Sequence, residues 1–194
     1  MKQNTQKLTR LALLSALTVL LANLPIKFGV IEMTLGIIPV AVGAITMGPV
    51  SGLILGIVLG GASFLQCLGI FVPSSFGATV LGINVWYTVI TCFVSRALMG
   101  WLTGWIFRAM RKTARVGSYV ASLSAALLNT VLFVGMVILF FWNSEYIRGI
   151  AAGYGTQNVL MFAVLFAGIN AAVEAVTTCL LAGTVSAALL RVKK

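Results

Sequence analysis

The chain has 194 residues, of which 60% are hydrophobic and 8% are charged, and its mean hydropathy is +1.10. A soluble domain usually carries about 25% charged residues, so this composition excludes a soluble globular protein and predicts an integral membrane protein. The net charge of +10 comes from 13 basic and 3 acidic residues. Because the basic residues gather at the ends of apolar segments, membrane topology explains them better than nucleic-acid binding does.

The apolar segments, taken in chain order, predict six helices that cross the bilayer, each needing roughly 20 residues. We expect them at residues 5–24, 35–47, 50–70, 86–107, 118–142 and 159–190. The expected fold is an all-α integral membrane protein, a six-transmembrane-helix bundle that forms a single membrane domain over residues 1–194.

Small residues recur on one face of two of these segments. Ala12 and Ala16 lie one turn apart in the first segment, and Gly52, Gly56 and Gly60 recur every four residues in the third. Small residues let helices approach closely in lipid, where the hydrophobic effect does not drive their association. We interpret the glycines as a packing stripe. The two alanines suit either an ordinary contact within the bundle or the docking of a partner helix.

The segment 71–85 is expected to be a partly apolar loop that folds over the bundle as a lid. Asn84 ends this loop, and Trp86 and Tyr87 follow it. The two aromatic residues fit an interfacial aromatic belt, and they also fit stacking on a ligand. We count all three, together with the amide of Gln66, among the candidate substrate-binding residues.

The distribution of basic residues predicts that both termini are cytoplasmic. With six spans, ten basic residues fall inside the cell and two, Lys27 and Arg148, fall outside. The loops 25–34, 71–85 and 143–158 then face outward, and a pocket beneath them would open to the outside. The ten inside residues are Lys2, Lys7, Arg10, Arg108, Arg111, Lys112, Arg115, Arg191, Lys193 and Lys194.

Four polar side chains lie deep inside apolar segments, namely Arg96, Asn129, Asn170 and Glu174. A charged group at the centre of a bilayer costs roughly 2.5 to 3.5 kcal/mol, so it requires a partner or a wet cavity. Asn170 and Glu174 share one helix face because they are four residues apart. We expect three helices to point these groups into one pocket. Arg96 and Glu174 are candidates either for contacting a ligand or for pairing with each other.

Several classes of chemistry are missing from the sequence. The chain has no histidine, no Walker A loop, and neither an HExxH nor a GxSxG motif. Its three acidic residues are spread over two loops and one helix, which does not suit a metal cluster or paired catalytic carboxylates. We therefore expect no enzyme activity, no catalytic residue, no metal and no cofactor.

The pattern resembles a known family. A small six-span chain with basic ends, Ala12-x-x-x-Ala16, the segment TLGIIPVAVGAITMGPVSGLILG and the segment NVWYTVITCFVSRALMGWLTGWIFRAM are similar to the substrate-binding S components of energy-coupling factor (ECF) transporters. The second and fourth segments look most like pantothenate-type members. Folate, pyridoxine and riboflavin stay open as substrates.

The resemblance implies a mechanism and partners. An S component of a prokaryotic cell membrane binds a water-soluble vitamin from outside. It then delivers the vitamin inward together with a membrane scaffold subunit and two cytoplasmic ATPases, and it is thought to topple in the membrane. Ala12 and Ala16 would dock on the scaffold. The alternatives are a stand-alone small secondary transporter or channel and a structural membrane protein without a ligand.

Overall fold

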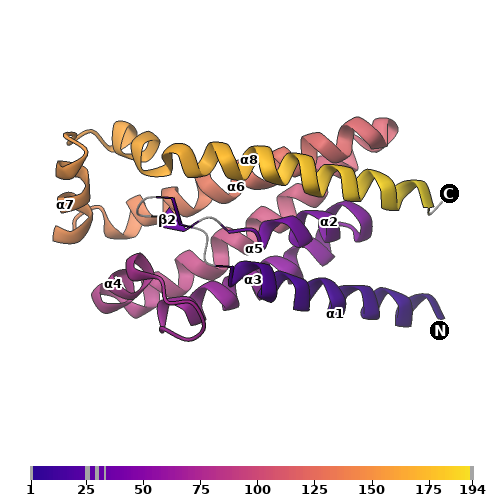
Figure 1. Ribbon diagram of the computed structural model, residues 1–194, viewed down its shortest axis with the longest axis horizontal. Helices are drawn as coiled ribbons and strands as arrows, with labels where there is room; N and C mark the ends of the chain where they lie inside the picture. The colour runs from indigo at the N-terminus through magenta and orange to yellow at the C-terminus, as the bar shows by residue number, and fades with distance from the viewer. Residues whose placement is uncertain (1, 25–26, 29–30, 33, 193–194) are drawn as a thin grey trace.

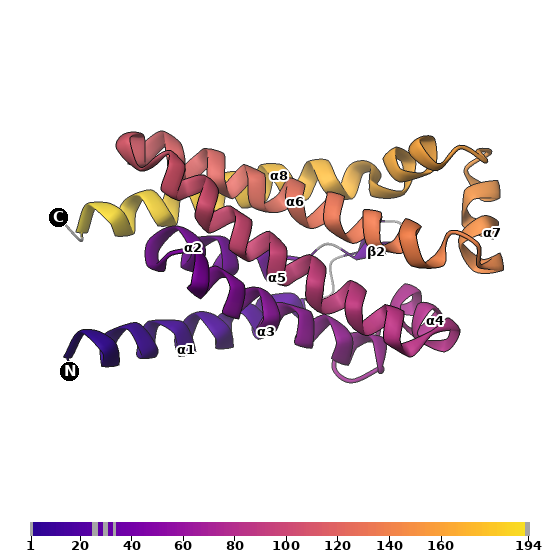
Figure 2. The same cartoon turned by 180° about the vertical axis from the view of Figure 1, so that it is seen from behind.

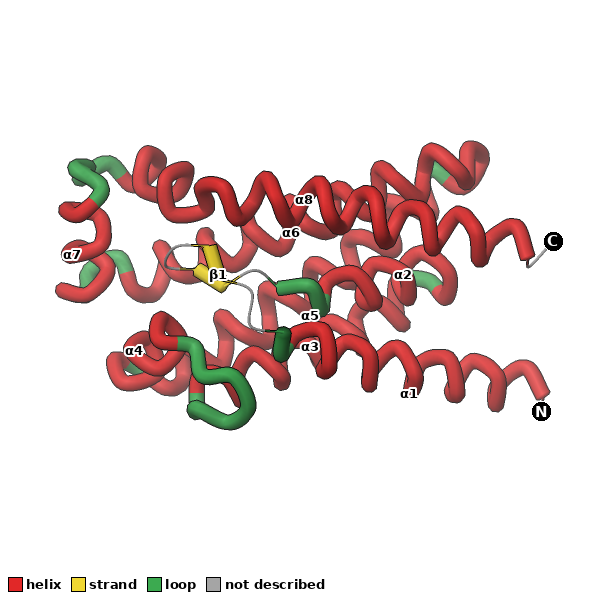
Figure 3. The backbone as a smooth tube through the Cα atoms, viewed as in Figure 1, coloured by secondary structure: helices red, strands yellow, loops and turns green. Residues whose placement is uncertain are grey.

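The computed structural model describes the backbone of residues 2–24, 27–28, 31–32 and 34–192 (Figure 1). Parts of the predicted loop 25–34, and the basic residues Lys193 and Lys194, therefore lie outside the described residues. The described chain is almost entirely helical, as Figure 3 shows. Its helices are α1 (Lys2–Ala22), α2 (Ile37–Met47), α3 (Pro49–Cys67), α4 (Ser75–Ile83), α5 (Val85–Ala109), the 3₁₀ turn η1 (Arg111–Thr113), α6 (Ala114–Phe141), α7 (Glu145–Gly153) and α8 (Val159–Val192).

The prediction of an all-α membrane fold is confirmed. The six expected segments correspond to α1, α2, α3, α5, α6 and α8, with ends that differ by a few residues. By length and composition, four helical stretches of the described chain are able to cross a membrane: Pro49–Cys67, Val85–Ala109, Arg111–Phe141 and Asn170–Arg191. The number of spans in the six-helix prediction stays a prediction.

Two segments that we expected to be loops contain helices. Ser74 caps α4 by accepting a hydrogen bond from the N–H of Gly77 at 3.2 Å. Ser144 caps α7 by accepting one from the N–H of Ile147 at 3.3 Å. The prediction of loops at 71–85 and 143–158 was therefore wrong over these two helices. The glycines of both segments favoured loops in the sequence, and the two serines were not recognised as helix N-caps.

The two ends of the molecule differ (Figures 1 and 2). The start of α1 and the end of α8 lie at one end, whereas α4 and α7 lie at the other. A two-stranded antiparallel hairpin, β1 (Lys27–Phe28) and β2 (Ile31–Glu32), lies between the helices and contacts α8. The strand that contacts α8 is β2.

The glycine stripe of α3 packs against the backbone of α5, which confirms its predicted role. A Cβ atom built on Gly52 would overlap the carbonyl oxygen of Gly100, and one built on Gly56 would overlap the carbonyl oxygen of Arg96. The same atom on Gly60 would lie 2.8 Å from the carbonyl oxygen of Cys92. This backbone-to-backbone contact fixes the height and rotation of α5, and with them the position of Arg96.

Helix α8 is broken at Gly168. This residue has φ 46° and ψ −141°, a conformation outside the helical region that side-chain-bearing residues rarely adopt. The break divides α8 into an apolar stretch, Val159–Gly168, and the longer stretch Asn170–Arg191. The sequence pattern predicted one continuous helix here, because a lone glycine is also compatible with a straight one.

Candidate functional site

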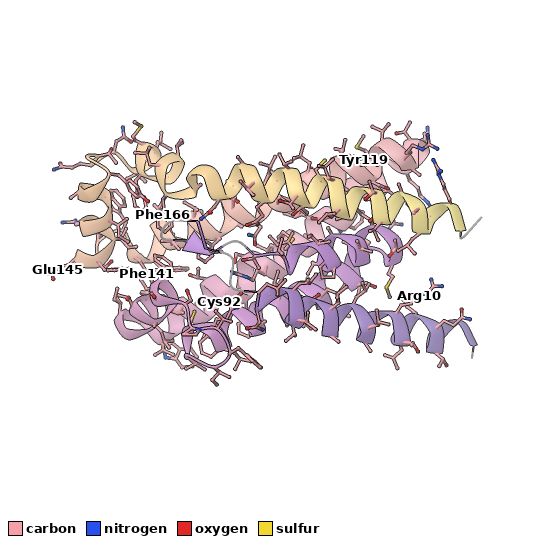
Figure 4. The ribbon with its side chains drawn as sticks, viewed as in Figure 1. Arg10, Cys92, Tyr119, Phe141, Glu145 and Phe166 are labelled. Atoms are coloured by element: carbon pink, nitrogen blue, oxygen red, sulfur yellow. The ribbon has the colours of Figure 1, made fainter. Side chains whose placement is uncertain are left out.

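A cavity of about 90 Å³ lies between α3, α5, α6 and α8, on the side toward α4. This volume is large enough for several water molecules or part of a small ligand. Figure 4 shows Cys92 between the middle of the bundle and the α4–α7 end, with Phe141 and Phe166 closer to that end. Apart from two thiols, the polar lining consists of Thr34, Ser63, Gln66, Ser74, Thr88, Thr91, Arg96, Asn129, Thr130, Asn170 and Glu174. All four predicted deep polar residues therefore line one cavity.

Glu174 is held by an amide rather than by a cation. The Nδ2 of Asn129 donates a hydrogen bond to Oε1 of Glu174 at 3.0 Å, which ties α6 to α8. The carboxylate also interacts with the backbone N–H of Thr34, just after the hairpin. Glu174 is only 6% exposed, so these donors replace the water that a buried carboxylate would otherwise require.

Arg96 occupies the cavity without a carboxylate partner in the described part of the chain. Its side chain is 7% exposed and its guanidinium lies 5.2 Å from the centre of the Phe133 ring. One Nη donates to the hydroxyl of Ser95 at 3.5 Å, and its Nε has no hydrogen-bond partner among the described atoms. The alternative of an Arg96–Glu174 ion pair is thus not formed in this structure, although the two charges line the same cavity.

Gln66 lies at the edge of the cavity and joins α3 to α1. Its Nε2 donates to the carbonyl oxygen of Ala22 at 2.7 Å and to the Oδ1 of Asn23 at 3.3 Å. These bonds close the end of α1 against the cavity wall. The Gln66 side chain lines the cavity, as expected for a candidate site residue, and it also has a structural role that the sequence pattern did not indicate.

Three predicted site residues are not brought to the cavity. Asn84 caps α5, accepting a hydrogen bond from the N–H of Tyr87 at 3.1 Å. Tyr87 stacks on Phe140 with ring centres 4.8 Å apart, and Trp86 is 77% exposed. None of the three belongs to the cavity lining. All three residues lie at the start of α5, and the rotation of this helix about its axis turns their side chains away from the cavity.

The structure adds residues that sequence reasoning missed. Cys67 and Cys92 line the cavity with their sulfur atoms 4.0 Å apart. Thr91 also lines it, and its buried Oγ1 has no hydrogen-bond partner among the described atoms. One signal was available in the sequence: Thr88, Thr91, Cys92 and Arg96 follow the i, i+3, i+4, i+8 spacing of one helix face.

The α1 alanines lie on an open face. Ala12 and Ala16 are exposed, and Leu13, Leu17 and Leu20 beside them are exposed as well. Within the described chain, the two alanines therefore do not make the intramolecular contact that was one of their two interpretations. This face is available to lipid or to another helix.

Comparison with known proteins identifies the family. The family model described as "ECF transporter, substrate-specific component" matches residues 6–186. A search of curated proteins found no significant match. This is a family of transporter components rather than of enzymes, and its substrate-specific role suits a cavity that holds two opposite charges. The match extends over most of the chain, so the chain belongs to the family of substrate-specific components of ECF transporters.

Proposed function

We propose that this S component captures a water-soluble vitamin that carries a carboxylate, with pantothenate favoured, in the cavity between α3, α5, α6 and α8. The observation that carries the proposal is Arg96, a buried cation that lines the cavity and has no carboxylate partner in the described chain. A buried unpaired charge is costly, and a ligand carboxylate would offset that cost by forming a charge-assisted hydrogen bond.

The other polar groups of the cavity suit the rest of such a ligand. Glu174, already held by Asn129, is an acceptor for ligand hydroxyl or amide donors. The amide of Asn170 and the hydroxyls of Thr91 and Thr130 line the same space. Pantothenate has a carboxylate at one end, hydroxyls at the other and an amide between them, so it matches a cavity with an Arg and a Glu. Folate, pyridoxine and riboflavin are the competing ligands.

The proposed topology has six spans, both termini in the cytoplasm of a prokaryotic cell, and α4 and α7 on the outer side. It is supported by the basic residues around η1 and by the common end at which α1 begins and α8 ends. Labelling of a Thr113→Cys protein in cells tests this topology. The thiol should react only with reagents that reach the cytoplasm, and reaction with an impermeant reagent added to whole cells would reverse the orientation.

The proposed partners are a membrane scaffold subunit and two ATPases, with Ala12 and Ala16 as the docking contact. Both alanines are exposed on α1, away from the cavity. Replacing both with Trp should abolish uptake by the assembled transporter and leave ligand binding to the isolated chain intact, because bulk on this face prevents close helix approach. Loss of both activities would indicate misfolding instead of lost docking.

The substrate is tested by mass spectrometry of the ligand that copurifies with the detergent-solubilised chain, followed by calorimetry with the four vitamins. Pantothenate should copurify and should bind most tightly. Copurification of riboflavin, which has no carboxylate, would refute the role given to Arg96. Uptake in cells without scaffold and ATPase subunits would instead favour a stand-alone transporter.

A further inference from the structure

We propose that Thr91 is the second group that binds the ligand carboxylate, so that α5 supplies both donors, the Thr91 hydroxyl and the Arg96 guanidinium. This inference rests on the proposed function, since it assigns a further contact to the same acidic ligand. Thr91 is 3% exposed and lines the cavity, and its Oγ1 has no hydrogen-bond partner in the described part of the chain. Buried hydroxyls are normally satisfied, so an acceptor from a ligand would complete this one.

Thr91 differs in this respect from two other threonines of α5. Thr88 donates to the carbonyl oxygen of Asn84 at 2.9 Å, and Thr103 donates to that of Met99 at 2.7 Å. A bond to the carbonyl four residues earlier is a common way for a helix to satisfy a threonine hydroxyl. Thr91 does not make this bond, although it is just as deeply buried. Its hydroxyl therefore stays available to the cavity that it lines.

Two hydrogen bonds bring the Arg96 guanidinium back toward Thr91. Nη1 of Arg96 donates to Oγ of Ser95 at 3.5 Å, and this Oγ donates to the carbonyl oxygen of Thr91 at 2.5 Å. These bonds in series place the guanidinium within about 6 Å of the Thr91 carbonyl oxygen. The direction agrees with the tilt of helical side chains toward the N-terminus of their helix. Arg96 and Thr91 therefore present their polar groups at one level of α5.

This pair of donors suits the size of a carboxylate. The Nε of Arg96 is buried and, like the Thr91 hydroxyl, has no hydrogen-bond partner among the described atoms. A carboxylate accepts through two oxygens, and its bonds to charged donors are about 2.7–2.9 Å long. Because the guanidinium and Thr91 lie on neighbouring turns, one oxygen is able to accept from each of them.

The α6–α8 side of the cavity offers acceptors instead. Oε1 of Glu174 already accepts a hydrogen bond from Asn129, and the buried Oδ1 of Asn129 has no partner in the described structure. A ligand carboxylate beside these oxygens would be repelled, whereas α5 presents it with donors. The acidic end of the ligand therefore lies along α5, and its hydroxyl or amide donors face Asn129 and Glu174.

The test compares pantothenate with panthenol, its alcohol, in which a hydroxyl replaces the carboxylate. Calorimetry on the full chain in detergent should show that wild-type protein prefers the acid by about ten- to a hundredfold. Thr91→Val removes the hydroxyl and keeps the shape of the side chain. It should weaken pantothenate binding by about five- to fiftyfold and panthenol binding by about threefold or less. The melting temperature of the ligand-free protein should not fall, because the hydroxyl has no partner there.

The matched control is Thr103→Val on the same helix. Thr103 is also buried, but its hydroxyl donates to Met99 and it does not belong to the cavity lining. This variant should keep the wild-type affinity for both compounds. Thr91→Ser, which retains a hydroxyl at this position, should keep the preference for the acid to within about threefold.

Three results would overturn the inference: a folded Thr91→Val protein with wild-type affinity for pantothenate, equal losses for the two compounds, or a loss in Thr91→Ser as large as in Thr91→Val. If Thr91→Val does not fold, Thr91→Ala provides the same comparison with less bulk. Loss of the acid preference in Arg96→Gln but not in Thr91→Val would refute only the role of Thr91. Wild-type protein that binds neither compound, or that does not prefer the acid, would overturn the proposed substrate as well.

Discussion

The two pairs of helices that enclose the cavity are held together in different ways. Helices α3 and α5 touch backbone to backbone, with the glycines of α3 against the carbonyl oxygens of Cys92, Arg96 and Gly100. Helices α6 and α8 are joined at the cavity through side chains, where Asn129 donates to Glu174, and α8 is broken at Gly168. Both pairs lie side by side in Figures 1 and 2.

This difference explains how one cavity holds Arg96 on α5 and Glu174 on α8. Because the backbones of α3 and α5 are in close contact, α5 has no freedom to slide or rotate. The Cα atom of Arg96, from which its long side chain extends, is therefore held in a fixed position. The α6–α8 pair also packs over much of its length, but at the cavity the two helices are joined by a side-chain hydrogen bond, which is weaker than close backbone packing. We expect substitutions of the α3 glycines to disturb folding most, substitution of Arg96 to weaken mainly ligand binding, and substitution of Asn129 to weaken the link between α6 and α8.

The largest effect is expected from Gly56→Val in α3. The new side chain would overlap the carbonyl oxygen of Arg96, and overpacking of this kind costs about 3 kcal/mol or more when backbone must move. Thermal melts in detergent should show a strong loss of stability. The control is Gly61→Ala, whose Cβ would lie 3.9 Å from the Phe93 ring, an ordinary contact. Equal stability of the two variants would contradict the rigid-pair interpretation.

Arg96→Ala should leave the fold largely intact and weaken pantothenate binding. The loss of a charge-assisted hydrogen bond is worth roughly 1.5 to 3 kcal/mol, which corresponds to about one to two orders of magnitude in Kd. Calorimetry combined with a melt separates binding from folding. Unchanged affinity in a well-folded protein would rule out the ligand role.

The double variant Arg96→Met with Glu174→Gln distinguishes a ligand contact from an ion pair. Because no ion pair joins the two residues in the described structure, the second substitution should not restore binding that the first removed. If stability and affinity both recovered in the double variant, Arg96 and Glu174 would be partners of each other, and the structural alternative would hold.

Asn129→Ala should cost about 1 to 3 kcal/mol of stability, because it leaves the buried carboxylate of Glu174 without its side-chain donor. Ser122→Ala on the same helix is the matched control. The Ser122 hydroxyl is buried and has no hydrogen-bond partner among the described atoms, so its removal should be nearly neutral. Similar melting temperatures for the two variants would refute the Asn129–Glu174 link between α6 and α8.

The smallest effect is expected from linking α3 to α5 through Cys67 and Cys92. Their sulfur atoms are 4.0 Å apart, so a mild oxidant should join them after small side-chain rotations, which mass spectrometry detects as a loss of two hydrogens. A Cys179→Ala background prevents other pairings. Because this pair of helices is rigid, the melting temperature should not fall. A marked fall would show that α3 and α5 move relative to each other.

Much of this protein follows from its sequence alone. Apolar length and low charge determine the membrane class, and the bounds of α1, α2, α3, α5, α6 and α8 follow from them to within a few residues. The four deep polar residues stand out because apolar segments rarely contain them. These properties are local, so no tertiary information is required.

Only the tertiary structure decided how these parts combine. The rotation of each helix about its axis brings Arg96, Asn129, Asn170 and Glu174 to one cavity and turns Trp86 away from it. The sequence alone did not reveal that an amide, rather than Arg96, holds Glu174, or that α8 breaks at Gly168. The physical reason is that helix rotation and helix breaks depend on contacts between residues far apart in the chain, which a local pattern does not contain.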